Sequence, residues 1–272
     1  MKKIFLLSAV AVASGAVISQ TPETSVTLYG LVDGGVTHTT GLKSGSVNQL
    51  VSGIMEGTRF GLRGSEDLGG GWRAIFTLEN RSEVDNGTIS NRPPSGSQLP
   101  DRLTDLGMLG LPSVLQPAVS GVLAQVGSTV GVNLANNFFD RQAYVGLVTP
   151  IGGFLLGRQY TPGYEVAGTF DIMGTQSSLA WGQVGAFPPS VDIRVSDALA
   201  YRIQKGPVTA GVMVTLPGGT AASKSANRLV GFLAMYKTDA FSVGLGYNAR
   251  NNEVGEKSLK SAIIGASAAM AL

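Results

Sequence analysis

The stretch that decides the fold runs from Thr58 to Glu79 and reads TRFGLRGSEDLGGGWRAIFTLE. From Trp72 onward, large apolar side chains at even positions alternate with polar ones such as Arg73 and Glu79 at odd positions. A period of two is typical of a β-strand that has one apolar and one polar face. The Gly- and Asp-rich run 66–71 supplies the residues that a tight turn favours. The stretch therefore predicts two strands joined by a short turn.

The same alternation recurs along the rest of the chain. It is clearest where Phe241, Val243 and Leu245 alternate with Ser242 and Gly244. About ten strands are predicted, over 25–37, 57–65, 72–81, 140–148, 153–160, 197–204, 208–216, 228–237, 241–248 and 259–268. Each is near the roughly 9–11 residues that a tilted strand needs to cross a bilayer. Polar residues interrupt every apolar run in these segments, which disfavours membrane-spanning helices there.

Short and long connections alternate between the predicted strands. The short turns lie at 66–71, 149–153, 205–207 and 238–240, and the long connections at 39–56, 82–139, 161–196, 217–227 and 249–258. This alternation places all short turns at one end of the sheet, as in outer-membrane barrels, whereas a soluble sandwich has no reason to do so. The predicted fold class is all-β, a transmembrane antiparallel β-barrel.

The first residues are typical of a secretory signal peptide. A basic start, Met1-Lys2-Lys3, precedes an apolar run and then small residues. Cleavage after Ala16 or after Ser19 fits this pattern, and we favour Ser19, although a buried N-terminal strand or helix is the alternative. The chain thus divides into a signal peptide, 1–19, and a barrel domain, 20–272.

Composition excludes several other classes of protein. Gly accounts for 38 of the 272 residues, and Gly costs about 1 kcal/mol in a helix interior, which argues against a helical enzyme. The chain has no Cys and one His, His38, so we expect no metal, no cofactor and no enzymatic activity. Twenty basic and eighteen acidic residues are too balanced for a protein that binds nucleic acid.

Four segments carry a family resemblance: SVTLYGLVD at 25–33, the opening stretch 58–79, RQAYVGL at 141–147 and LGRQY at 156–160. In residue identity, order and spacing they resemble the general porins of Gram-negative β-proteobacteria, the family that includes the neisserial porins. The resemblance implies a trimeric, water-filled, sixteen-stranded outer-membrane barrel that passes ions and small hydrophilic solutes by passive diffusion. It also implies that 161–196 folds inward as a constriction loop. The partners implied are outer-membrane lipids, lipopolysaccharide and the barrel-assembly machinery.

Two features depart from the family pattern. About ten strands are visible where the family has sixteen, and the chain ends at Leu272 without a terminal aromatic residue. Because an open sheet in lipid leaves edge groups unpaired, we expect a C-terminally truncated chain, with a fragment or a short barrel as alternatives. The second feature is 106–139, a stretch without any charge inside the predicted external insert 82–139. It suits either a packed helix or an additional hairpin.

Alternation also predicts which charges line the pore. Five arginines lie opposite the apolar positions of their strands: Arg59, Arg63, Arg73, Arg81 and Arg202. An Arg on the lipid face costs about 2–4 kcal/mol at mid-bilayer, so we expect these side chains to form a basic wall inside the barrel. The inward loop offers Glu165 and Asp171 across the channel. The alternative for each Arg is a place at a strand end, where it pairs with turn carboxylates, and Arg158 is open between the two faces.

Three functions remain open at this stage. The first is a diffusion porin, the second a truncated relative without channel activity, and the third a barrel that serves as a platform for adhesion or an enzyme. No catalytic group of residues supports the third.

Overall fold

A computed structural model describes residues 24–42, 45–87, 110–119, 138–171, 193–216, 225, 227–252 and 255–269. Its strands are β1 (Ser25–Leu31), β2 (Gly34–Leu42), β3 (Gly45–Ser52), β4 (Arg59–Gly69), β5 (Trp72–Arg81), β6 (Gln142–Thr149), β7 (Gly152–Tyr160), β8 (Arg194–Lys205), β9 (Val208–Thr215), β10 (Leu229–Lys237), β11 (Phe241–Asn251) and β12 (Lys257–Ala268), and helix α3 spans Pro162–Phe170. The predicted signal peptide and most of the uncharged stretch lie outside the described residues. Within that stretch, a helical turn is described at 116–119.

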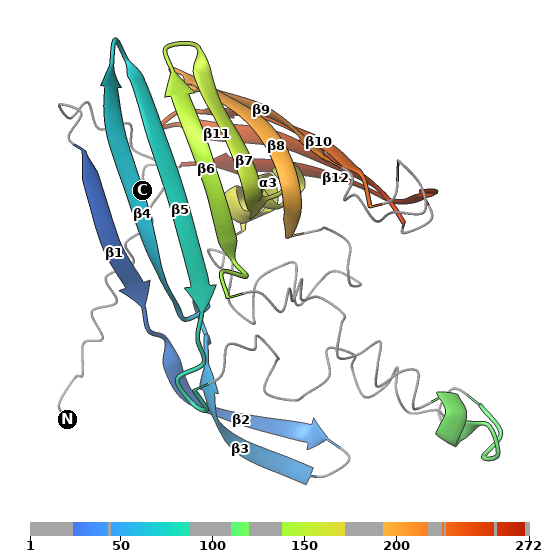
Figure 1. Cartoon of the computed structure of the whole chain (residues 1–272). Helices are drawn as coiled ribbons and strands as arrows, with labels where there is room; N and C mark the ends of the chain where they lie inside the picture. The colour runs from blue at the N-terminus through green and yellow to red at the C-terminus, as the bar shows by residue number, and fades with distance from the viewer. Residues whose placement is uncertain are drawn as a thin grey trace.

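Ten strands form one antiparallel sheet in the order β1-β4-β5-β6-β7-β8-β9-β10-β11-β12 (Figure 1). These ten strands confirm the number that alternation predicts, and most ends differ by a few residues. The first predicted strand, 25–37, is too long, because β1 ends at Leu31 and residues 34–37 belong to β2. From β4 onward each strand pairs with its neighbour in sequence, so the four short turns all lie at one end, here named the turn end. The opposite end is the loop end. At the turn between β4 and β5, Gly69, Gly70 and Gly71 all have positive φ angles, which suit glycine.

The long loop predicted over 39–56 is wrong, because β2 and β3 form a separate two-stranded sheet there. The chain leaves the large sheet at Asp33. Its carboxylate Oδ2 accepts hydrogen bonds of 2.6 Å from the backbone N–H groups of Met55 and Glu56, and its carbonyl accepts one of 2.8 Å from Gly53. These bonds join the two ends of the hairpin. The chain therefore turns away from the large sheet because of contacts between residues about twenty positions apart. The alternation of apolar and polar residues gives no information about such contacts.

The large sheet curves, and α3 lies inside the curve against β10, β11 and β12 (Figure 1). We name the face that carries α3 the inner face. The other, outer face exposes apolar side chains, among them Val230, Phe232, Phe241, Val243 and Leu245. Aromatic pairs also lie there, such as Phe232 with Tyr247, whose ring centroids are 5.4 Å apart. A continuous apolar outer face is what contact with lipid requires.

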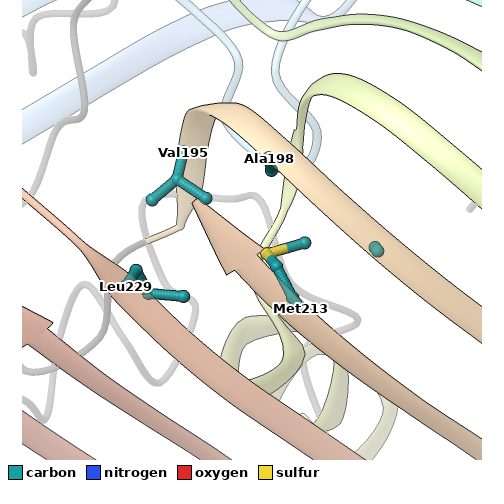
Figure 2. Close-up of a cluster of buried hydrophobic side chains, with 5 residues drawn as sticks. Val195, Ala198, Met213 and Leu229 are labelled. Atoms are coloured by element: carbon teal, nitrogen blue, oxygen red, sulfur yellow. The ribbon is translucent and has the colours of Figure 1, made fainter. Parts of the chain in front are cut away.

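The buried core is small and lies on the inner side of three neighbouring strands. Figure 2 shows Val195, Ala198, Met213 and Leu229 gathered on β8, β9 and β10. Within the described segments, β1 and β12 are the two edges of the large sheet and are not paired with each other. No helix in the described part of the chain is long and apolar enough to cross a membrane.

Candidate functional site

The inner face can be followed across the sheet from the strand under α3. A Cβ added at Gly246 of β11 would lie 2.9 Å from the Cα of Gly163, so Gly246 faces α3. Residues directly opposite each other in an antiparallel sheet share a face. Through Leu233 and Gly211, the register leads from Gly246 to Arg202.

The register continues from Arg202 to Arg73 through the facing residues Gly153 and Val148. The same alternation places the remaining predicted arginines, Arg59, Arg63 and Arg81, on this face too. All five arginines therefore share the face that carries α3.

Arg202 is joined directly to the helix. Its Nη2 lies 2.7 Å from Oε1 of Glu165, and its Nε donates to Oε2 at 3.3 Å. For this arginine, the expectation that Glu165 stands across an open channel is therefore wrong. α3 packs against strands close to β8, which brings the carboxylate within contact distance. Asp171, the other predicted acidic residue, is the C-cap residue at the far end of α3.

Glu79 is the centre of an ion-pair cluster at the loop end of the sheet. Its Oε1 lies 2.7 Å from Nε of Arg141, and its Oε2 lies 3.6 Å from Nε of Arg59. Tyr29 donates its hydroxyl to the same carboxylate at 3.0 Å, and Arg59 also pairs with Glu56 at 3.0 Å. The charge of Arg59 is thus matched by carboxylates, which is the strand-end alternative raised from sequence.

Arg81 forms a second, deeply buried ion pair at the same end. Its Nε contacts Oδ2 of Asp140, and both side chains are only 3% exposed. Arg158, whose face the sequence left open, is also buried and donates from Nε to the carbonyl of Asp140 at 2.6 Å. Its Nη1 donates to Ser196 at 3.1 Å. Sequence reasoning did not single out Asp140, which only the fold brings to Arg81.

Tyr160 links the sheet to the start of α3, and sequence reasoning missed its role. Its hydroxyl accepts from Nη2 of Arg141 at 3.2 Å and from Nη2 of Arg194 at 3.0 Å. The Arg194 guanidinium also lies over the Tyr160 ring, 4.6 Å from its centroid. The ring stacks on Tyr164 of α3 with centroids 5.1 Å apart. One feature of the sequence could have indicated this role: these residues lie at or near the ends of predicted strands, and Tyr160 directly precedes the predicted inward loop.

Arg63 and Arg73 differ from the other three predicted arginines. Neither makes an ion pair with any described residue, and Arg73 is exposed. Arg63 lies 5.4 Å from the centroid of the Tyr29 ring, in a cation–π contact. Both side chains thus carry a positive charge without a direct ion pair on the inner face, and Asp67 is the residue directly opposite Arg73 in the sheet.

One acidic group beside the site has a shifted pKa. Burial and the nearby negative charge of Asp85 raise the pKa of Glu83, just beyond the loop end of β5, to about 7. In the described segments, no group of three or more acidic or His side chains could hold a metal ion.

Comparison with known proteins adds three findings. A protein-family model described as Gram-negative porin matches residues 6–272. An outer membrane porin protein of Bordetella pertussis is 36% identical over 101 residues, which make up 32% of this chain and 26% of that protein. Outer membrane porin protein 32 of Delftia acidovorans is 42% identical over 91 residues, or 33% of this chain and 25% of that protein.

Solved structures show the same fold. The anion-selective porin from Comamonas acidovorans matches with a TM-score of 0.61 and 22% identity, over 90% of this chain and 64% of that chain. OmpF of Salmonella typhi, solved with daunomycin, matches with a TM-score of 0.55 and 20% identity, over 89% and 61% of the two chains. The chain thus spans somewhat less than two thirds of either solved chain, and its aligned segments cover about a quarter of the curated relatives.

Proposed function

Because this chain belongs to the Gram-negative porin family, we propose that it forms a water-filled channel in the outer membrane for passive diffusion of ions and small hydrophilic solutes. The observation that carries the proposal is the division of the sheet into two faces. The outer face is apolar, whereas the inner face carries arginines and α3. A lipid-facing exterior and a charged interior are the two requirements of a channel wall.

The remaining assignments belong to the same proposal. Residues 1–19 act as the signal peptide, 82–139 form an external insert, and 161–196 narrow the channel, which the place of α3 on the inner face supports. Homotrimeric assembly and contacts with lipopolysaccharide and the barrel-assembly machinery follow from family membership alone. The channel is not expected to catalyse a reaction.

A preference for anions is part of the proposal. It rests on Arg63 and Arg73, which make no ion pair with a described carboxylate, because fixed charges on a pore wall attract ions of opposite sign. The solved relative from Comamonas acidovorans is itself described as anion-selective. The charges of Arg202 and Arg59 contribute less because each is paired with a carboxylate.

The test is the reversal potential of the purified full chain in a planar bilayer under a salt gradient. The double variant Arg63→Ser/Arg73→Ser is expected to shift the potential towards cations while the protein still inserts. The matched control Glu165→Gln/Arg202→Gln removes one charge of each sign and is expected to leave the potential close to that of the parent. An unchanged potential in the first variant would contradict the proposed role of these arginines, and a folded parent that passes no current would contradict the channel itself.

A further inference from the structure

Asn248 is a fully buried polar residue on the inner face of β11, and its two polar atoms bond to the first turn of α3 and to its N-cap residue. Its side-chain Oδ1 accepts the backbone N–H of Gly163 at 3.1 Å. Its Nδ2 donates to Oγ1 of Thr161 at 3.0 Å. These partners lie more than eighty positions away in sequence, so the contact is purely tertiary. A buried amide costs free energy unless it is hydrogen-bonded, and among the described residues Asn248 meets that requirement through Gly163 and Thr161.

The first turn of α3 needs one hydrogen-bond partner from outside the helix. The first N–H groups of any helix have no partner inside the helix. In α3, Pro162 has no N–H, and the N–H of Tyr164 is capped by Oγ1 of Thr161 at 3.3 Å. The N–H of Glu165 bonds to the carbonyl of Thr161 at 3.0 Å. The N–H of Gly163 is therefore the group that remains, and Asn248 accepts it.

Glycines in the sheet around Asn248 and in α3 allow the helix to pack closely against the sheet. A Cβ at Gly231, the facing residue on β10, would lie 3.1 Å from Cγ of Pro162. A Cβ at Gly246 would lie 2.9 Å from the carbonyl oxygen of Pro162, and one at Gly163 would lie 2.8 Å from Nδ2 of Asn248. Glycines in both the sheet and the helix thus leave enough space for the backbone of α3 to contact the sheet. Side chains at these positions would separate the two surfaces and break the bonds to Asn248.

We propose that Asn248 is the wall-side anchor that fixes the start of α3 against the sheet and so sets the width and steadiness of the channel. Asn248 is a positioning residue, since it acts on permeation only through the helix. The anchoring part rests on the contacts above, and the effect on permeation rests on the proposed channel function. The two parts therefore need separate measurements.

The test places a spin label on α3 and measures its mobility. The chain has no Cys, so Thr169→Cys, at an exposed position in the last turn of α3, gives a single labelling site. In lipid-reconstituted protein, adding Asn248→Leu is expected to raise the mobile fraction of the nitroxide spectrum by at least about twofold, because two hydrogen bonds are lost. Asn248→Asp keeps an acceptor for Gly163 and can accept the Thr161 hydroxyl, so it is expected to restore the parent spectrum.

Asn80→Leu is the matched control. Asn80 is also fully buried in the sheet, but its side-chain atoms have no hydrogen-bond partner among the described residues. This variant is expected to leave the label as immobile as in the parent. Thr161→Val, which removes the partner on the helix, provides a second route if Asn248→Leu does not fold, and it is expected to mobilise the label as well.

An immobile label in folded Asn248→Leu or Thr161→Val, or equal mobilisation by Asn80→Leu, would overturn the anchor. Single-channel recording of the same variants measures the second part. Loss of the anchor is expected to increase current noise in the open state, and steady currents despite a mobile label would overturn the effect on permeation. If the parent carries no current while the label responds as expected, the anchor holds and the proposed function fails.

Discussion

At the scale of single residues, the ion pair between Arg81 and Asp140 is the most deeply buried of those described. Removing one partner leaves an uncompensated charge in the interior, so Arg81→Met is expected to lower the free energy of unfolding by about 3–5 kcal/mol. Arg81→Met/Asp140→Leu is expected to recover most of that loss, since two Arg81 nitrogens and one Asp140 oxygen have no hydrogen-bond partner in the described structure. Urea unfolding of reconstituted protein measures both. A double variant as unstable as the single one would show that the pair itself stabilises the fold.

Glu83 gives stability a dependence on pH. Its pKa in the folded protein, about 7, lies above the ordinary carboxyl value, so the folded state binds more protons between about pH 4.5 and 7. The free energy of unfolding is therefore expected to fall as the pH rises through this window. Glu83→Gln should flatten the urea midpoint against pH, and Asp85→Asn should shift the fall to lower pH by removing a repelling charge. A urea midpoint that rises with pH over this range in the parent protein, but not in Glu83→Gln, would contradict the raised pKa of Glu83.

At the scale of elements, the far end of α3 packs on glycine. Cβ atoms at Gly244 and Gly265 would come within 2.5 and 2.3 Å of the Phe170 ring. Gly265→Ala therefore forces about 1–3 kcal/mol of overpacking, which α3 can relieve by moving away from the wall into the channel. We expect a lower single-channel conductance. Gly153→Ala, on the same inner face, meets only a methyl group of Val148 at 3.9 Å and should conduct like the parent; equal conductance of the two variants would argue against a wall-packed helix.

The elements also show what the sequence could predict. The alternation of apolar and polar residues depends only on which face of a strand contacts water. It therefore identified the ten strands and placed Arg202 on the inner face. It did not predict the β2–β3 hairpin, because the hydrogen bonds of Asp33 that start it are tertiary. The contacts of Glu79, Asp140 and Tyr160 were not predicted for the same reason. They join strand ends whose separation in sequence is set by long connections, and no local pattern reports which ends meet.

At the scale of the whole molecule, β1 and β12 are the edge strands of the large sheet and have no further neighbour among the described residues. The N–H and C=O groups along the free sides of β1 and β12 cannot stay unpaired in lipid, where each costs several kcal/mol. Any bilayer-inserted form must therefore pair both edges, with each other or with further strands. Alternation predicts how many strands cross but not which strand closes the sheet, so closure was the feature of the fold that the sequence left undecided.

The neighbour-to-neighbour order of the sheet has a consequence for how the chain folds. Four hairpins, β4–β5, β6–β7, β8–β9 and β10–β11, close through turns of two or three residues, whereas β5 and β6 are separated by roughly sixty. The entropy lost on closing a loop grows with its length, and this difference amounts to about 3 kcal/mol. The four hairpins are thus the natural early intermediates, and the seam between β5 and β6 forms late. That seam is crossed by Arg141 bonding to Glu79 and by Asp140 bonding to Arg81, so these two ion pairs complete the assembly of the sheet.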